Sequence, residues 1–169
     1  MIFIGGIHGV GKSFFCALAK DRYGINTYSS GVLIAEYKKT PYLAEKKVDD
    51  VADNQNILQF ALQKIGEPAD CYLLDGHFCL LDKLGQIKEI EPRVFEELKP
   101  KALLVLTALP GIISDRLNKR DGISYSVQKL EVFQNQEILY AQQIALNLGI
   151  PIKICSDSEK GLEFIGSLL

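Results

Sequence analysis

Short apolar runs alternate with longer amphipathic stretches along the whole chain. Runs of four or five apolar residues bounded by polar or turn residues are typical of buried strands, whereas apolar residues that recur every three or four positions predict helices. On this basis we expect five strands, near residues 1–4, 26–28, 71–75, 103–107 and 150–154. Strands separated by helices predict an α/β fold, with a parallel sheet covered by helices on both faces.

Helical periodicity is clearest in three segments. One helix is predicted from Phe14 onward, a second over residues 45–65, and a third over residues 127–148. Ser29–Gly31 supplies cap residues for a further helix that begins near Val32. These assignments leave turns at the ends of the strands, which is where polar residues collect.

The turn between the first strand and the first helix carries the most specific motif of the chain. It reads Gly-Ile-His-Gly-Val-Gly-Lys-Ser, which fits the P-loop pattern G-x-x-x-x-G-K-[ST] at every required position. The glycines let the backbone turn with its N–H groups inward, Lys12 reaches terminal phosphates, and the Ser13 hydroxyl can ligate Mg²⁺. The motif predicts a site for a nucleoside triphosphate formed by Gly6, Gly9, Val10, Gly11, Lys12, Ser13 and Phe14.

Other candidates lie at the ends of the remaining strands, because open parallel sheets bind ligands at their carboxyl edge. Asp75 closes the third strand, where it either holds Mg²⁺ or its water or only caps the next turn. Ser30 and Gly31 follow the second strand, where they bind a second anionic ligand or simply cap the helix. Arg116 and Arg120 lie four residues apart, so they either face one ligand together or belong to a solvated helix end.

Two further polar residues have open interpretations. Gln55 falls on the apolar stripe of the helix over residues 45–65, so it either pairs within the core or reads a base edge or phosphate. His77 binds a phosphate, assists a proton transfer, or satisfies backbone groups in a loop. Residues 77–90 predict a small hairpin with a glycine turn, which either lies over the acceptor pocket or only covers the edge of the core.

Composition limits the domain count and the compartment. A chain of 169 residues that is 47% hydrophobic suits one domain over residues 1–169. The net charge of −2 argues against a large nucleic-acid footprint, although a local contact with RNA or a protein partner stays open. No apolar stretch approaches the ~20 residues that span a bilayer. Reduced thiols in a cytoplasmic protein are expected, because no C-x-x-C pair connects Cys16, Cys71, Cys79 and Cys155.

Taken in order, these motifs resemble nucleoside monophosphate kinases. The P-loop, Ser-Ser-Gly after the second strand, Leu-Asp-Gly-His at the end of the third and Arg-Leu-x-x-Arg-Asp carry the likeness, from Met1 to about Ile154. It is closest to the archaeal-type and nuclear-type adenylate kinases, whose third strand also ends in Asp-x-His. The resemblance implies a three-layer P-loop fold with a five-stranded parallel sheet of order 2-3-1-4-5, an acceptor nucleotide over Ser29–Gly31 and a short arginine-bearing lid.

The resemblance also implies an activity and residue roles. The activity is ATP–Mg²⁺-dependent phosphoryl transfer to a nucleoside monophosphate or a similar small phosphate-bearing acceptor. Lys12 would stabilise the transferring phosphoryl group, Ser13 would ligate Mg²⁺, and Asp75 would orient Mg²⁺ or its water. Arg116 would lie near the ATP base or phosphates, and Arg120 would close on the transferring group.

The chain departs from this family at the acceptor side. Long-chain adenylate kinases carry one arginine in the helix after the acceptor loop and another just after the third strand. This chain has Glu36, Lys38 and Lys39 in the first region and His77 in the second. Two alternatives therefore stay open: a P-loop ATPase that acts as a switch in macromolecular assembly, and a kinase of a non-nucleotide or polynucleotide acceptor.

Overall fold

The computed structural model describes residues 1–38, 51–65, 71–82 and 84–169 of the chain. In these ranges the elements are, in chain order, β1 (Ile2–Gly5), α1 (Lys12–Tyr23), β2 (Asn26–Ser29), α2 (Ser30–Lys38), α4 (Val51–Ile65), β3 (Tyr72–Asp75), β4 (Cys79–Leu81), β5 (Ile87–Glu89), α5 (Pro92–Leu98), β6 (Ala102–Leu106), α6 (Pro110–Asp121), α7 (Val127–Leu148), β7 (Ile152–Cys155) and α8 (Ser158–Gly166). Each of the five expected strands is present, and its bounds lie within two residues of the prediction.

The main sheet has five strands in the order β2-β3-β1-β6-β7, and all neighbouring pairs are parallel. This confirms the predicted α/β class with a five-stranded parallel sheet. The order differs from 2-3-1-4-5 only in its labels, because β4 and β5 form a separate antiparallel hairpin that takes two numbers. Since all five strands run the same way, the loops after β1, β2, β3, β6 and β7 meet at one edge of the sheet.

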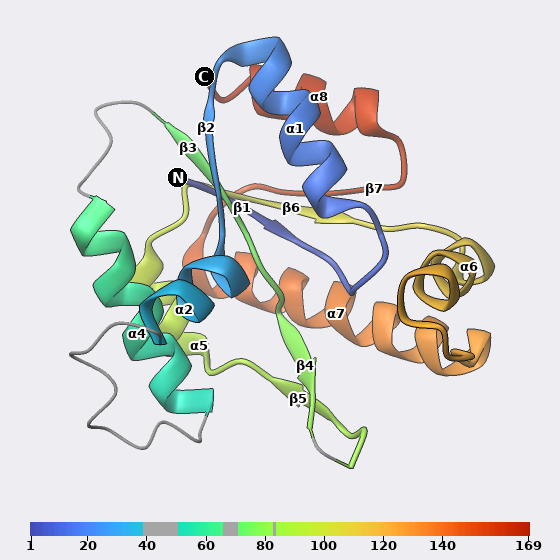
Figure 1. Cartoon of the computed structure of the whole chain (residues 1–169). Helices are drawn as coiled ribbons and strands as arrows, with labels where there is room; N and C mark the ends of the chain where they lie inside the picture. Colours follow the sequence, from blue (N-terminus) through green and yellow to red (C-terminus); the bar gives the residue numbers. More distant parts are fainter. Residues whose placement is uncertain (39–50, 66–70, 83) are drawn as a thin grey trace.

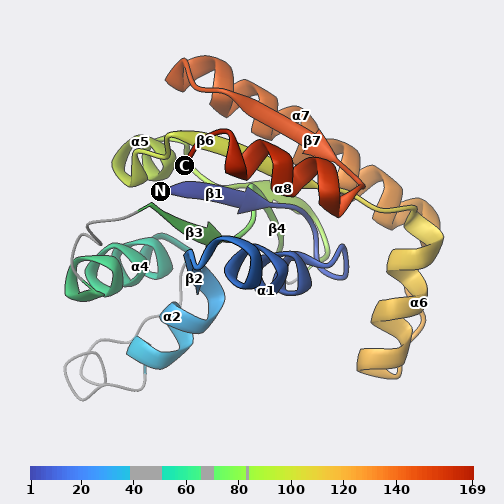
Figure 2. The ribbon, with the colours of Figure 1, turned by 90° about the horizontal axis from the view of Figure 1, so that it is seen from above.

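Helices cover both faces of this sheet. Helices α1 and α8 pack against each other and against the sheet on one face, and α5 and α7 lie on the other (Figures 1 and 2). Helices α2 and α4 pack together beside the β2 edge. Among the helices that the structure describes, none combines the length and the apolar character needed to cross a bilayer.

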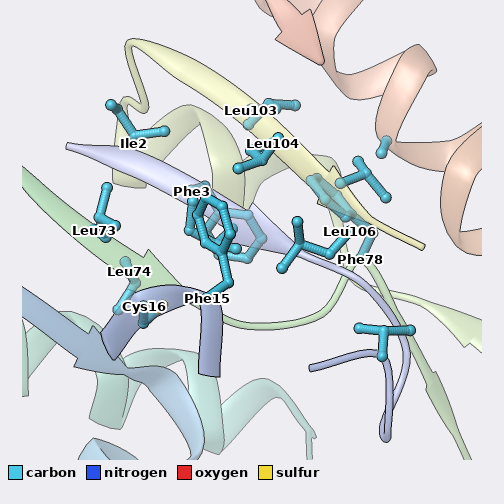
Figure 3. Close-up of a cluster of buried hydrophobic side chains, with 14 of the residues drawn as sticks. Ile2, Phe3, Phe15, Cys16, Leu73, Leu74, Phe78, Leu103, Leu104 and Leu106 are labelled. Carbon is cyan, nitrogen blue, oxygen red and sulfur yellow. The ribbon is translucent and has the colours of Figure 1, made fainter. Parts of the chain in front are cut away.

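The core lies on both faces of β1 and β6, whose residues are buried along their whole length. Phe15 and Cys16 of α1 fill one face, and Figure 3 shows them beside the strand side chains. On the other face the Phe3 ring lies 5.1 Å from that of Phe78, edge to face. A Cβ on Gly5 would come within 2.2 Å of the Phe78 ring, so glycine is required for this close approach. The loop after β3 is thereby packed against the end of β1.

Several element boundaries differ from the prediction. Helix α2 begins at Ser30, so Ser30 and Gly31 form its first turn instead of preceding it as caps. The part of the helix predicted over residues 45–65 that precedes Val51 lies outside the described residues. Helices α5 and α8 were not predicted, although Pro92 at the first position of α5 and Asp157 as the N-cap of α8 are start signals.

Candidate active site

The P-loop connects β1 to α1 along a path that requires its glycines. Gly6, Gly9 and Gly11 have φ angles of 136°, 84° and 108°, which L side chains rarely adopt. A Cβ on Gly9 would also lie 3.0 to 3.1 Å from side chains of Leu117 and Ile113 on α6. The motif spacing therefore serves both the turn itself and the close contact of the loop with α6.

Lys12 begins α1 and is 9% exposed. Its Nζ donates hydrogen bonds to the carbonyl oxygens of Gly6 at 2.6 Å and Ile7 at 3.4 Å. Burial lowers the pKa of Lys12 to about 8, and the carboxylates of Asp75 and Glu137 partly oppose that shift. The ammonium thus rests on carbonyls of its own loop, where a phosphate would offer it stronger, charge-assisted acceptors.

Two oxygen donors suited to a hard divalent cation line the same cavity, Ser13 at the start of α1 and Asp75 at the end of β3. Asp75 lies opposite Ser29 in the β2–β3 register, and its Oδ1 accepts a hydrogen bond from Ser29 Oγ at 3.3 Å. Burial raises the pKa of Asp75, and Lys12 and Ser29 partly offset that rise. A hydroxyl and a carboxylate are ligands that Mg²⁺ takes alongside phosphate and water, so this donor set fits Mg²⁺.

The two predicted arginines both line the cavity at the P-loop, but they have different partners. Arg116 Nη1 donates to the carbonyl oxygens of Gly9 at 3.1 Å and Val10 at 3.0 Å. Arg120 donates two hydrogen bonds to the carboxylate of Asp121, at 2.5 and 2.7 Å, and its side chain is 58% exposed. The structure therefore brings both arginines to the cavity at the P-loop, where Arg120 is hydrogen-bonded to the adjacent residue Asp121.

The arginine-bearing stretch that the resemblance implied as a short lid lies on α6, and the segment that follows it is attached to that helix through Tyr125. The Tyr125 N–H donates to Asn118 Oδ1 at 2.9 Å, and its carbonyl oxygen accepts from Ser114 Oγ at 2.8 Å. Its hydroxyl donates to Asp121 at 2.6 Å. Gly122 follows α6 as its C-cap, with a φ of 71°. Movement of this segment relative to α6 would have to break these bonds of Tyr125, whereas movement together with α6 would keep them.

The same cavity also holds polar atoms that lack partners. The cavity has a volume of about 600 Å³. Among the described residues, the buried side-chain atoms without a hydrogen-bond partner are Ser30 Oγ, Asn54 Oδ1 and His77 Nδ1, and all three residues line it. Buried polar groups are nearly always hydrogen-bonded, so three unpartnered atoms in one cavity indicate a ligand-binding surface.

This surface brings together Ser30, Gly31 and His77, three of the predicted acceptor residues. The side chain of Gln55, the fourth, lies outside the described part of the structure, and the neighbouring Asn54 supplies the amide. The rest of the wall is largely apolar, with side chains that include Phe3, Ile34, Leu58, Val94 and Phe95. Such a pocket suits a small molecule with an apolar body and a few polar groups.

His77 lies against His8 of the P-loop, with ring centroids 4.3 Å apart. Burial, assisted by Lys12 and His8, lowers the pKa of His77 to about 2. Burial, assisted by Lys12, also lowers the pKa of His8. At neutral pH His77 therefore offers a ligand a neutral ring nitrogen and no positive charge.

The hairpin of β4 and β5, predicted within residues 77–90, is confirmed as an antiparallel pair. Asp82 stabilises its turn by accepting from the N–H groups of Leu84 and Gln86. Leu80 and Ile90 line the cavity, so the hairpin forms part of the pocket wall in addition to covering the core.

A second hollow of about 500 Å³ lies between the P-loop and the ends of β6 and β7. Its lining includes Phe14, which is 65% exposed, with Arg116, Thr107 and Ser156. An exposed aromatic ring beside polar side chains and next to a phosphate loop is a surface that can hold the base and ribose of a nucleotide.

Two polar residues on α7 were missed by the sequence analysis. Glu137 is fully buried and accepts hydrogen bonds from three backbone N–H groups, and Gln134 exchanges two hydrogen bonds of 3.0 Å with the backbone of Ala108. Both lie on the buried face of a helix whose apolar positions were predicted. The sequence could have revealed them, because Gln134 and Glu137 share the helical period of the apolar residues Phe133 and Ala141. Val127, the first residue of the predicted helix, is 47% exposed.

Comparisons with known proteins agree with this picture. A family model described as an AAA domain matches residues 5–134. A protein of Methanocaldococcus jannaschii named "Putative adenylate kinase" is 29% identical over 119 residues, which are 70% of this chain and 58% of that protein. The chain thus matches a little over half the length of that relative. These findings confirm the resemblance to P-loop kinases of the adenylate kinase type.

Solved structures show the same fold. A shikimate kinase from Acinetobacter baumannii in complex with shikimate has a TM-score of 0.62 at 16% identity, covering 98% of this chain and 92% of its own. A shikimate kinase from Bacteroides thetaiotaomicron has a TM-score of 0.59 at 14% identity, covering 99% and 96%. A gluconokinase from Sinorhizobium meliloti has a TM-score of 0.53 at 12% identity, covering 97% and 91%.

Proposed function

The chain belongs to this AAA-domain family, and we propose that it transfers the γ-phosphoryl group of ATP to a small acceptor. The observation that carries the proposal is one shared cavity, which is lined both by Lys12 and Ser13 of the P-loop and by the residues with unpartnered polar atoms. Phosphoryl transfer depends mainly on positioning and on charge neutralisation. A cavity that holds donor and acceptor side by side meets the first need, and the cations around the P-loop meet the second.

The proposed cofactors are ATP and Mg²⁺, and Mg²⁺ when bound neutralises charge on the phosphate oxygens. Ser13 and Asp75 are the residues that would hold it. Lys12 would release the carbonyls of its own loop and donate to the terminal phosphates. Arg116 would bind the phosphates beside the second hollow, and Arg120 would turn from its neighbouring carboxylate to the transferring group, which would help to exclude water.

We propose a nucleoside monophosphate or a similar phosphate-bearing molecule as the acceptor, bound over Ser30 and Gly31. The free N–H groups at the start of α2, a nine-residue helix, favour anionic oxygens. The apolar wall of the cavity suits a flat ring such as a base. His77 would donate or accept one hydrogen bond, and Gln55 remains a predicted ligand of the base or phosphate.

A kinase of a non-nucleotide acceptor that bears no phosphate group is the second candidate, and one observation favours it. Among the described residues that line the cavity, the cations are Lys12, Arg116 and Arg120, which belong to the P-loop and α6. The acceptor side presents neutral hydroxyl, amide and imidazole groups. Solved structures with this fold include kinases named for shikimate, which bears no phosphate group.

The test is a panel of nucleoside monophosphates and of hydroxylated acceptors without phosphate, hydroxy acids included, each incubated with ATP and Mg²⁺ while ADP and the phosphorylated product are followed together. We expect one acceptor to raise ADP formation many-fold over basal hydrolysis, because closure around two bound ligands is what makes the site productive. Hydrolysis that no acceptor stimulates, but that a macromolecular partner does, would overturn the proposal in favour of an ATPase switch.

A further inference from the structure

We propose that Glu137 on α7 is a positioning residue that sets the spacing between the P-loop and the loop that follows β3. The inference rests on the proposed function, because these loops carry groups assigned to the donor and to the acceptor. Glu137 lines neither hollow, so it would act only through the backbone that it binds.

The Glu137 carboxylate connects two loops that are far apart in sequence. Its Oε1 accepts hydrogen bonds from the N–H groups of Gly6 at 3.0 Å and Phe78 at 2.9 Å. Its Oε2 accepts from the N–H of Cys79 at 2.6 Å. The side chain is 0% exposed. Because Gly6 follows β1 and Phe78 follows β3, one side chain fixes the ends of two neighbouring strands.

Three N–H donors require an acceptor with two oxygens and no proton directed at them. Burial raises the pKa of Glu137, and the three backbone donors and Lys12 oppose that rise. A glutamine of the same shape would turn an N–H₂ group toward at least one donor. An aspartate would keep the charge but withdraw the carboxylate by one methylene, so it could not reach all three donors. Both changes should therefore disturb the spacing of the loops without emptying the core.

Each of the two loops is connected to a group that we assign to the reaction. The Gly6 N–H binds Glu137 while the Gly6 carbonyl oxygen accepts from Lys12 Nζ at 2.6 Å. Phe78 directly follows His77, whose unpartnered Nδ1 lies in the cavity. A shift of the carboxylate therefore moves Gly6, at the start of the loop that carries Lys12, relative to the loop that carries His77. A displacement of ~1 Å in a reacting group costs on the order of 100-fold in rate.

Tyr140 provides a matched control on the same helix. It is 8% exposed, and its hydroxyl donates to the Ile90 carbonyl oxygen at 2.5 Å, at the end of the hairpin. This bond reaches the loop after β3 only indirectly, because the Ile90 N–H donates to the Phe78 carbonyl oxygen at 2.9 Å. Tyr140→Phe therefore removes one buried hydrogen bond from α7 while all three Glu137 bonds to the two loops stay in place.

The experiment compares Glu137→Gln, Glu137→Asp and Tyr140→Phe with the parent protein. We expect both Glu137 variants to lower kcat about 10- to 100-fold while the KM for ATP stays within about threefold. Tyr140→Phe should lower the Tm and keep kcat within about twofold. The proposal is overturned if the Glu137 variants keep the parent kcat, or if Tyr140→Phe loses as much. It is also overturned if neither Glu137 variant folds, because the carboxylate then serves stability.

Failure of this inference can be distinguished from failure of the proposed function. The parent protein is assayed first, so a wrong function shows as absent transfer in the parent. The amide resonances of Gly6, Phe78 and Cys79 are then compared in ¹⁵N spectra, which need no acceptor. We expect all three to move together in Glu137→Gln. If only those of Phe78 and Cys79 move, the carboxylate does not connect the loops and the inference is wrong.

Discussion

Helices α6 and α7 both follow β6 and both direct polar side chains to the P-loop, but they do so in opposite ways. Glu137 and Gln134 of α7 are buried and hold backbone groups at the ends of three strands. Arg120 of α6 is 58% exposed and is bound to Asp121 on its own helix. Figure 2 shows the corresponding placement, with α7 running along the sheet and α6 extending away from it.

The difference separates a fixed part of the site from a part that can move. A buried carboxylate with three backbone donors cannot leave without exposing those donors, whereas an exposed ion pair contributes little and exchanges easily. Phosphoryl transfer uses both properties, since the reacting groups must be held in place and water must be excluded once both ligands are bound. We therefore expect substitutions in the P-loop and α7 to act on positioning and those in α6 to act on closure.

The largest effect is expected in the fixed part, from Lys12→Ala. Loss of the ammonium should lower phosphoryl transfer by more than about 1000-fold, because it removes the P-loop cation that we propose binds the terminal phosphates. The fold should persist, since burial already destabilises the charge of Lys12. Turnover and thermal unfolding are the measurements, and Lys20→Ala on the exposed side of α1 is the control. A folded variant with near-parent turnover would show that the P-loop is not the catalytic site.

Arg120→Lys tests the movable part and should have the next largest effect. Lysine keeps the charge but not the paired donors that fit a phosphoryl group, so turnover should fall about 10- to 1000-fold. The affinity for ATP should change little, because Arg116 and the P-loop still bind the nucleotide. The neighbouring exposed residue gives the control, Lys119→Ala. If Arg120→Lys and Arg120→Ala both turn over like the parent, Arg120 belongs only to a solvated helix end.

A pH series tests the fixed part of the site, because Lys12, its cation, has a strongly lowered pKa. The pKa of Lys12 is about 8, against an ordinary value of 10.5. Above about pH 8 the free protein loses the ammonium, so kcat/KM for ATP should fall by about tenfold per pH unit. Stability should change in the opposite direction, rising toward pH 10.5 as the folded state releases a proton that the unfolded chain keeps. A flat profile of kcat/KM between pH 7 and 9.5 would contradict this role.

The smallest effect is expected from Asp121→Asn, which removes the carboxylate charge that binds the Arg120 guanidinium. The hydrogen bonds of Arg120 and Tyr125 lower the pKa of Asp121 to about 2, so the carboxylate stays charged at any working pH. Releasing Arg120 from this exposed pair should raise turnover by about two- to fivefold where closure limits the rate. Steady-state kinetics at saturating ATP is the measurement. A marked loss of turnover would show instead that Asp121 orients Arg120 for the reaction.

Much of the fixed part could be predicted because its signals are local. The P-loop glycines, Lys12 and the strand that precedes them form one continuous motif, and the apolar runs of β3 and β6 identify buried strands without any long-range information. The resemblance then supplied the sheet order. Asp75 could be placed in the site because the ends of parallel strands meet at one edge.

The rest depends on contacts that the sequence does not reveal. Glu137 binds N–H groups 131 and 59 residues away, so its role appears only when α7 is packed on the sheet. The choice of Gln55 over Asn54 depended on the phase of α4, which a run of three amides leaves open. The His8–His77 contact likewise depends on how two strand ends meet. Asp121 was not predicted as the partner of Arg120, because neighbours on a helix do not usually face each other.

The most direct test of the central claim is the product balance of a single reaction with γ-labelled ATP, Mg²⁺ and the acceptor that stimulates ADP formation most. We expect nearly all of the label that leaves ATP to appear on the acceptor, one equivalent for each ADP formed, with little inorganic phosphate. Label that appears in inorganic phosphate at the same rate with and without every acceptor would contradict phosphoryl transfer as the function of this site.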